Sequence, residues 1–263
     1  MDTTTEVNQK QPLVSILMLT YNRASFIGEA ITSVLAQTYT NFEVIIIDDG
    51  STDDTPEVVN SFNDPRIRYI KNDTNQGLIV RRKESLACAK GKYVAVIDSD
   101  DLWCSRDKLK KQVEVLDKNS NCAIVGTFIT IINKDGKEMT SAKYNIADAN
   151  IRNNILIRNQ FAHSSVLMRK TMLDKTAGYY SLAVAEDFEL FLQLGLQGTF
   201  VNLPEYLTKY RVHGVGESAN KYRIVTHVLQ VIKLHKNHYP NYYKAWLKFI
   251  LYRWFLMHKK AIN

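Results

Sequence analysis

The stretch Tyr93-Val94-Ala95-Val96-Ile97-Asp98-Ser99-Asp100-Asp101 joins an apolar run directly to three carboxylates. A continuous apolar run of this kind is typical of a strand that is covered on both faces of a parallel sheet. Carboxylates clustered at the end of such a strand repel one another unless a divalent cation, which also grips a phosphate, neutralises them. The alternative is an acidic turn that caps a helix and lies in solvent.

A second acidic group follows another apolar run. Residues 42–47 read Phe-Glu-Val-Ile-Ile-Ile and lead into Asp48-Asp49-Gly50-Ser51. In open α/β sheets, ligands bind outside the carboxyl ends of parallel strands. We therefore expect the two acidic strand ends to meet in one crevice, which favours a ligand site over two unrelated turns.

Strand and helix patterns alternate along the first half of the chain. This alternation predicts an α/β fold with a doubly wound, mostly parallel sheet and helices on both faces. Ser25 is expected to cap the first helix, and Thr55 the second. The predicted strands are 14–19, 42–47, 67–70, 93–97 and 122–132, and the predicted helices follow Ser25 and Thr55 and cover 78–89 and 105–116.

The second half is less regular. Lys134-Asp135-Gly136-Lys137 is a hairpin signal, whereas residues 140–159 have weak periodicity and receive no assignment. Beyond them, the patterns predict a strand at 161–169, a helix at 186–196, and two short strands within 199–212 around Pro204.

Length and composition fit one large α/β domain with an appendage. The 263 residues are 45% hydrophobic and 23% charged, which is ordinary for a globular protein. No apolar run approaches the ~20 residues that span a bilayer, and residues 1–11 are expected to be a disordered lead-in rather than a signal peptide. Cys88, Cys104 and Cys122 lack the spacing of a disulfide framework or thiolate zinc site, and they fit a reducing cytosol.

The positive charge of the chain is concentrated at its C-terminal end. Residues 218–263 hold nine Lys and Arg and no Asp or Glu, so that removing these nine charges from the net +7 leaves −2 for residues 1–217. The basic character is therefore no sign of a nucleic-acid-binding main domain.

Further motifs stand in a fixed order between Pro12 and His213. Together with the acidic strand ends, they resemble the family 2 inverting glycosyltransferases with the nucleotide-sugar-binding GT-A fold. The resemblance implies a catalytic domain at 12–217, with a nucleotide-sugar-binding half (12–132) and an acceptor-side half (133–217), followed by a helical basic and aromatic extension at 218–263. The motifs are Val14-Ser15-Ile16-Leu17 with Thr20-Tyr21-Asn22, residues 47–55, Asn75-Gln76-Gly77 with Arg82, residues 91–101, Glu186-Asp187, and Tyr210-Arg211-Val212-His213.

This resemblance implies a UDP-sugar donor site. Tyr21 has the alternative of a core aromatic residue, and Arg82 that of a solvated helix residue in the basic run 81–83. Lys83 stands where many relatives have asparagine, which leaves the local contacts open. The implied residues are Leu19, Thr20, Tyr21, Asp48 and Asp49 for the uracil and ribose, Arg82 for the uracil or a phosphate, and Asp98 with Ser99 for the ribose or donor sugar.

The resemblance also implies a divalent cation, Mn²⁺ or Mg²⁺, on the diphosphate of the donor. Asp100 is the implied ligand, and His213 would complete the coordination, although a histidine after a strand is more often structural. Asp101 and Arg211 are implied in supporting roles. A Lewis acid that bridges the two phosphates would stabilise the departing UDP.

Asp187 is the implied general base, with Glu186 beside it in a supporting role. Asp187 would take the proton of the acceptor hydroxyl while the oxygen attacks the anomeric carbon, so that the configuration inverts and an α-linked donor gives a β-glycoside. Without the family context, this acid at the start of a helix would be interpreted as an N-cap.

The C-terminal segment 239–260 interleaves aromatic and basic residues. One interpretation is a helix that lies on an anionic membrane surface; the other is a helix whose aromatic residues pack back on the catalytic domain. The first would suit a saccharide acceptor linked to undecaprenyl diphosphate, and a protein that is cytoplasmic and peripheral on the inner membrane. No nucleic-acid partner is expected.

Two competing functions remain at this stage. A sugar-phosphate nucleotidyltransferase shares the doubly wound sheet and acidic metal sites, but no Gly-rich phosphate loop lies near the first strand. A non-catalytic sugar-nucleotide-binding scaffold would be expected to have lost acids, whereas Asp48, Asp98, Asp100 and Asp187 are all present. The donor sugar, the acceptor hydroxyl and the oligomeric state are not determined by the sequence.

Overall fold

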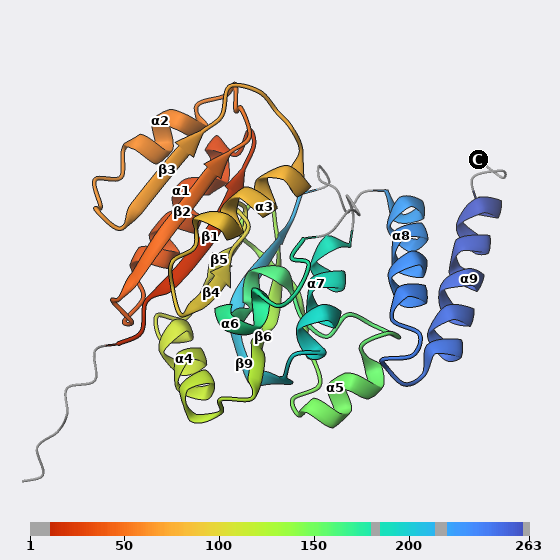
Figure 1. Cartoon of the computed structure of the whole chain (residues 1–263). Helices are drawn as coiled ribbons and strands as arrows, with labels where there is room; N and C mark the ends of the chain where they lie inside the picture. The colour runs from red at the N-terminus through yellow and green to blue at the C-terminus, as the bar shows by residue number, and fades with distance from the viewer. Residues whose placement is uncertain (1–10, 180–184, 214–219, 260–263) are drawn as a thin grey trace, which may run out of the picture.

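A computed structural model describes residues 11–179, 185–213 and 220–259, which form a nine-stranded sheet flanked by helices (Figure 1). The strand order is β3-β2-β1-β4-β8-β6-β9-β5, and β7 pairs with β6. The lead-in predicted at residues 1–11 lies almost wholly outside the described residues. The strands are β1 Val14–Thr20, β2 Phe42–Asp48, β3 Ile67–Lys71, β4 Tyr93–Val96, β5 Leu102–Trp103, β6 Cys122–Asn133, β7 Glu138–Ala142, β8 Leu167–Arg169 and β9 Thr199–Val212.

Helices cover both faces of the sheet, as predicted. Successive residues of β1 enter two separate hydrophobic clusters: Leu17 and Leu19 join the one shared with α7, and Ile16 and Met18 join the one shared with α1 and α4. A strand covered on both faces has no polar face, because its side chains alternate between two cores. The helices are α1 Ala24–Leu35, α2 Thr55–Asn60, α3 Leu78–Cys88, α4 Lys108–Lys118, α5 Asp148–Asn154, the 3₁₀ turn η1 His163–Ser165, α6 Lys170–Leu173, α7 Glu186–Gly195, α8 Lys221–Leu234 and α9 Tyr242–Lys259.

The α/β architecture is confirmed, and the parallel part of the sheet is β3-β2-β1-β4. Beyond β4 the sheet is mixed, because β8 joins both β4 and β6 in antiparallel pairs. Strand β1 lies between β2 and β4 and pairs with both in parallel. The acids that follow β2 and β4 therefore emerge at the same edge, as predicted from the sequence.

Four local predictions are wrong. Thr55 was expected to cap the second helix, but it is the first residue of α2, and Asp54 is the N-cap. Residues 161–169 were expected to form one strand, but they form η1 followed by the short β8. The two short strands expected around Pro204 are one strand, β9, whose pairing with β6 shifts register near that proline. Helix α1 begins at Ala24 rather than after Ser25, because Asp53 Oδ2 accepts a hydrogen bond from the Ala24 amide at 3.1 Å.

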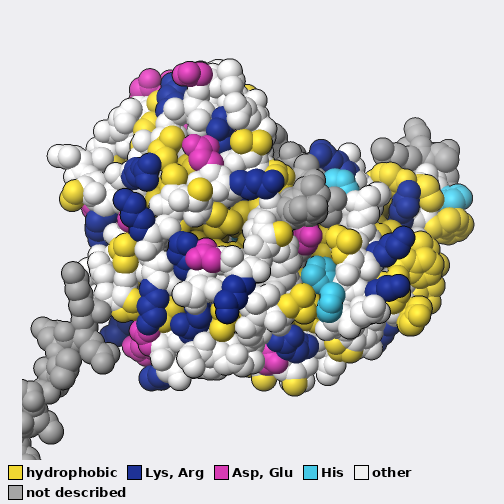
Figure 2. Space-filling view, in the orientation of Figure 1, with side chains coloured by type: hydrophobic (Ala, Val, Ile, Leu, Met, Phe, Trp, Pro, Cys, Tyr) yellow, Lys and Arg dark blue, Asp and Glu magenta, His cyan; other side chains and the backbone are white. Residues whose placement is uncertain are grey.

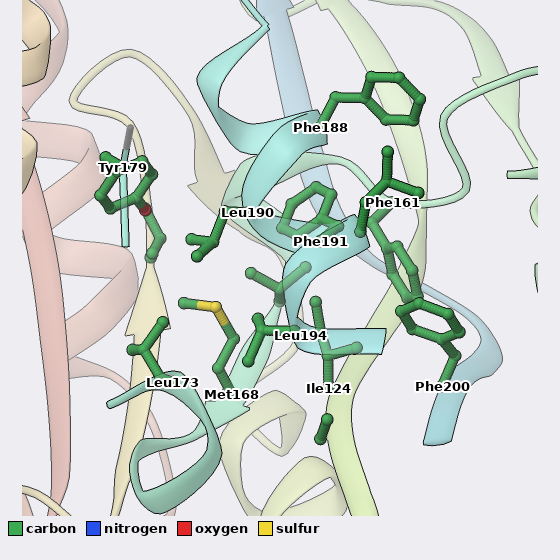
Figure 3. Packing of buried hydrophobic residues seen from close by; sticks show 14 of the residues in the cluster. Ile124, Phe161, Met168, Leu173, Tyr179, Phe188, Leu190, Phe191, Leu194 and Phe200 are labelled. Atoms are coloured by element: carbon green, nitrogen blue, oxygen red, sulfur yellow. The ribbon is translucent and has the colours of Figure 1, made fainter. Parts of the chain in front are cut away.

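Helix α7 packs into the larger of the two cores. Its Phe191 meets Phe161 edge to face, with ring centroids 5.4 Å apart, and Phe161 in turn lies 5.6 Å from Phe200 of β9 (Figure 3). Aromatic packing of this kind holds the helix firmly against the sheet. The first turn of α7, which carries Glu186 and Asp187, is thereby fixed relative to the strand ends.

The C-terminal extension is a pair of helices, α8 and α9, at one side of the molecule (Figure 1). Val231, Tyr239 and Ala245 belong to the same hydrophobic cluster as α7, and the Tyr239 hydroxyl donates to the Leu192 carbonyl at 2.6 Å. Within the described ranges, none of the helices is both long and apolar enough to cross a membrane. The division of the catalytic domain into a nucleotide-sugar-binding half (12–132) and an acceptor-side half (133–217) stays a prediction.

Candidate functional site

The end of β2 is shaped by Asp48, whose side chain is fully buried. Its carboxylate accepts hydrogen bonds from the Ser51 amide at 2.8 Å and from the Tyr69 hydroxyl at 2.6 Å. Beside it, at the end of β1, Thr20 is buried with no hydrogen-bond partner for its Oγ1. Tyr21 is 42% exposed, which excludes the alternative of a core aromatic residue. The predicted contacts of these residues and Leu19 with uracil and ribose stay predictions.

Asp49 has a different role, because it holds the loop that begins α3. Its carboxylate accepts from the amides of Gln76 and Gly77, both at 2.8 Å, and from Arg81 Nε at 2.6 Å. Gly77 has a φ of 90°, a backbone conformation that glycine adopts most readily. This carboxylate is therefore committed to the loop, and Arg81 is the residue of the basic run that faces it.

Arg82 lies at the centre of the candidate site and is buried. Its Nη2 donates to Asp98 Oδ1 at 2.7 Å, and its Nε lies 3.9 Å from Glu186 Oε1. The Nε and Nη1 atoms have no hydrogen-bond partner, although both are buried. Buried donors without a partner are costly, so these two atoms are available to a ligand. In the basic run 81–83, only Lys83 is exposed, whereas Arg81 and Arg82 are buried. Arg82 is therefore not a solvated helix residue.

Asp98 follows β4 and lies beside the guanidinium group of Arg82 and the imidazole of His163. Burial opposes its ionisation, but the charge of Arg82 and the nearby imidazole of His163 outweigh it and lower the pKa of Asp98. His163 Nδ1 lies 3.8 Å from Asp98 Oδ1, and its Nε2 is 2.8 Å from the Tyr179 hydroxyl. His163 and Tyr179 were missed by the sequence analysis, because neither belongs to a recognisable spacing.

Asp101 and Ser99 are both buried within the acidic turn. Asp101 Oδ1 accepts from the Arg211 amide at 2.7 Å, and its other oxygen is hydrogen-bonded by the Ser164 hydroxyl. Burial and the charges of Asp98 and Asp100 raise the pKa of Asp101 well above its usual range. Arg211 also donates from Nε to the Asp100 carbonyl at 2.8 Å. The supporting roles predicted for Asp101 and Arg211 stay predictions.

Asp100 and His213 lie side by side. His213 Nε2 is 2.8 Å from Asp100 Oδ2, and the His213 ring stacks on Phe26. Arg23 Nε approaches the same carboxylate oxygen at 3.4 Å. Among the residues that the structure describes, no three His, Cys, Asp or Glu side chains are grouped to hold an ion. A carboxylate oxygen and an imidazole nitrogen fit Mn²⁺ or Mg²⁺ as a partial set that oxygens of a ligand would complete.

Asp187 is the second residue of α7 and is partly exposed. Its Oδ1 accepts from the Phe188 amide at 2.7 Å, and Asn159 Nδ2 lies 3.5 Å from its Oδ2. Glu186 beside it is buried; burial and the charge of Asp187, against that of Arg82, raise the pKa of Glu186 to about 7.

Tyr210 lies on β9, next to Arg211. Burial, followed by the charges of Asp101, Asp98, Asp100 and Asp187, raises the pKa of Tyr210. The first turn of α7 reaches Asp98 through Arg82. The sequence analysis quoted Tyr210 within a motif but did not assign it to the site.

The family is established by comparison with known proteins. The model of "Glycosyl transferase family 2" matches residues 15–176, which is more than half of the chain. The chain belongs to glycosyl transferase family 2. An Escherichia coli relative, the UDP-Glc:alpha-D-GlcNAc-diphosphoundecaprenol beta-1,3-glucosyltransferase WfaP, is 33% identical over 84% of this chain and 86% of its own length. An uncharacterized glycosyltransferase of Haemophilus influenzae is 32% identical over 77% of this chain, which spans only 66% of that relative.

Solved structures with a similar fold agree with the architecture. Staphylococcus aureus TarS 1-349 in complex with UDP-GlcNAc superposes with a TM-score of 0.71 and 20% identity, covering 90% of this chain and 71% of TarS. The mannosyltransferase PcManGT from Pyrobaculum calidifontis, in complex with GDP-Man and Mn²⁺, gives a TM-score of 0.68 and 20% identity, covering 93% of this chain and 70% of PcManGT. At these identities, the likeness establishes the fold of this glycosyltransferase and nothing finer.

Proposed function

We propose that the protein transfers a hexose or N-acetylhexosamine from a UDP-sugar to a sugar hydroxyl with inversion of configuration. One observation carries the proposal: Arg82 is buried between Asp98 and Glu186 with two donor atoms that have no hydrogen-bond partner. A diphosphate or sugar oxygen would satisfy these donors at the edge of the sheet where α/β folds bind ligands. The UDP-GlcNAc complex of TarS and the UDP-Glc donor in the name of WfaP favour a UDP-sugar over other nucleotide sugars.

Within this site, each group has a distinct task. Asp98 and Ser99 would bind the ribose or donor sugar, and Arg82 would bind the diphosphate or sugar through the N–H groups that have no hydrogen-bond partner. Leu19, Thr20, Tyr21 and Asp48 line the position proposed for uracil and ribose. Because Asp48 already accepts two internal hydrogen bonds, its contribution to uracil binding depends on its remaining lone pairs.

Asp100 and His213 are the proposed ligands of Mn²⁺ or Mg²⁺. A divalent cation bound there would stabilise the negative charge that develops on the leaving UDP. The Mn²⁺ in the PcManGT complex supports a divalent cation in this fold without identifying its ligands. Arg23 adds a positive charge at the same carboxylate and helps to hold Asp100 in position.

Asp187 is the proposed general base. It removes the proton of the acceptor hydroxyl as the acceptor oxygen forms its bond to the anomeric carbon and the bond from that carbon to the UDP oxygen breaks. The products are the glycoside, UDP and the proton held by Asp187, and an α-linked donor gives a β-linkage. The partial exposure of Asp187 leaves room for the acceptor.

The proposed acceptor is a saccharide on a lipid carrier such as undecaprenyl diphosphate, in the assembly of a bacterial surface polysaccharide. The name of WfaP, whose acceptor is alpha-D-GlcNAc-diphosphoundecaprenol, supports this class. The reaction would then take place at the cytoplasmic face of the membrane, where both nucleotide sugars and the carrier are accessible.

The test is UDP release from a panel of UDP-sugars, with Mn²⁺ or Mg²⁺ and with EDTA, by the wild type and the Asp100→Ala and Asp187→Asn variants. Slow hydrolysis of one donor, lost with EDTA and in Asp100→Ala, would support the transferase and name its sugar. We expect Asp187→Asn to lower turnover about 10²–10⁴-fold while UDP binding is retained. No turnover and no metal-dependent UDP binding would overturn the proposal in favour of the scaffold.

A further inference from the structure

Helix α9 has two faces of different character. One face packs on the protein: Ala245 is buried, Tyr242 and Phe249 lie against the core that includes α7, and Arg253 Nη2 donates to the Tyr222 hydroxyl of α8 at 3.0 Å. This part agrees with the interpretation in which the aromatic residues of the tail pack back on the domain. This packing involves only one face of α9.

The other face points away from the protein and is apolar. Its residues recur at intervals of three and four, the spacing of one side of a helix. They are between 53% and 82% exposed, which is unusual for large apolar side chains gathered on one face. Figure 2 shows the resulting band of hydrophobic atoms along the outer edge of α9. We call it the outward stripe; it consists of Tyr243, Leu247, Leu251, Trp254 and Phe255.

Charge on the surrounding surface narrows the choice of partner. Lys244 and Lys248 are exposed on the same helix, and residues 218–263 contain no Asp or Glu. In a twofold dimer formed through this stripe, the same patch would face itself. The lysines of both copies would then be brought together with no acid of the extension to offset them. A surface that is anionic throughout meets no such repulsion.

We propose that the outward stripe of α9 is a docking surface for an anionic lipid bilayer. Tyr and Trp, with an apolar body and a polar edge, are suited to the boundary between headgroups and acyl chains. Leu247, Leu251 and Phe255 supply the inserted apolar area, and Lys244 meets the anionic headgroups. Lys248 adds positive charge beside it, although its Nζ donates to the Ile157 carbonyl at 2.7 Å. The inference deepens the proposed function, since a lipid-linked acceptor would be held at the same surface, but its test needs neither donor nor acceptor.

The experiment measures binding to phosphatidylcholine vesicles with and without phosphatidylglycerol, using tryptophan emission and its quenching by brominated lipids. Trp103 is buried in the sheet, whereas Trp246 and Trp254 are exposed on α9, so quenching reports on α9. We expect quenching on anionic vesicles, weaker quenching in Trp254→Phe than in the wild type, and at least about tenfold weaker binding in Leu247→Glu/Leu251→Glu. Lys244→Ala should weaken binding to anionic vesicles about fivefold.

Met139→Glu is the matched control, because Met139 is an exposed apolar residue on β7, far from the extension in sequence. It should bind vesicles like the wild type. Equal binding to neutral and anionic vesicles would overturn the assignment of the lysines. No vesicle binding, together with a dimer that dissociates in Leu247→Glu/Leu251→Glu by analytical ultracentrifugation, would assign the stripe to a second copy instead. If vesicles bind but neither donor turnover nor metal-dependent UDP binding is found, the lipid surface stands and the proposed function fails.

Discussion

In most proteins, charged side chains lie at the surface and large apolar side chains lie inside. The edge of the sheet and the outer side of α9 depart from this distribution in opposite ways. At the sheet edge, charged groups such as Arg82, Asp101 and Glu186 are buried, whereas on α9 large apolar side chains are exposed. Proteins bury charges only where other groups compensate them, and seldom expose contiguous apolar surface. The two proposals above interpret each departure as a binding place: for a polar ligand in the first case and for an apolar surface in the second.

The largest effect on stability should come from breaking the compensation at the sheet edge. Arg82→Met removes the cation between Asp98 and Glu186 and leaves both carboxylates without it. Loss of one partner of a buried pair costs about 3–5 kcal/mol, and we expect the lower end because Asp98 keeps 31% of its side chain exposed. Urea denaturation measures the free energy of unfolding. Lys83→Met, on the exposed neighbour, should change it by less than about 0.5 kcal/mol; a similar loss in both variants would contradict the central role of Arg82.

The sheet edge should also lose stability as the pH rises. The pKa of Glu186 is raised from 4.5 to about 7 by burial and by Asp187. A carboxyl whose folded pKa is raised stabilises the fold below its unfolded pKa, and this contribution is lost as the pH passes from 4.5 to about 7. Glu186→Gln should therefore gain up to about 3 kcal/mol over wild type between about pH 4.5 and pH 8. Thermal melting across that range measures it, with Glu114→Gln on the exposed face of α4 as the control. If the difference in stability between Glu186→Gln and the wild type did not change with pH, the raised pKa of Glu186 would be refuted.

The α8–α9 extension should show the opposite dependence on pH. His235 is buried, its Nδ1 has no hydrogen-bond partner, and burial followed by His238 lowers its pKa to about 4. A lowered folded pKa means stability that is present above pH 6.5 and lost as the pH falls toward 4. His235→Phe, which keeps a ring beside Tyr239, should remove up to about 3 kcal/mol of this acid sensitivity. The exposed His258→Phe should leave it unchanged.

The sequence predicted the strands and acids of the sheet edge, but not the other side chains that meet there. The β1, β2 and β4 strands and the acids after them follow from local patterns, since each strand is a continuous apolar run. The roles of His163 and Tyr179 depend on contacts with residues far away in the chain, for which a single sequence gives no signal.

Strand β9 illustrates a second limit. Pro204 interrupts the strand pattern and predicted two strands, yet the register shift opposite Thr127 and Phe128 lets one strand continue past it. On α9, the aromatic and basic composition left packing and membrane contact as alternatives. The backbone then assigned one face of the helix to the core, while the other stays exposed.

The two faces of α9 allow the smallest and most discriminating prediction. Leu251→Ser removes an apolar side chain that is 57% exposed and should change the free energy of unfolding by less than about 0.5 kcal/mol. Phe249→Ser, two residues away but packed against the core with α7, should cost at least about 2 kcal/mol. Chemical denaturation without lipid measures both. If Leu251→Ser were as destabilising as Phe249→Ser, the stripe would be part of the fold, and its exposure would no longer indicate a partner. If it is neutral, selection for folding does not explain why leucine stands there.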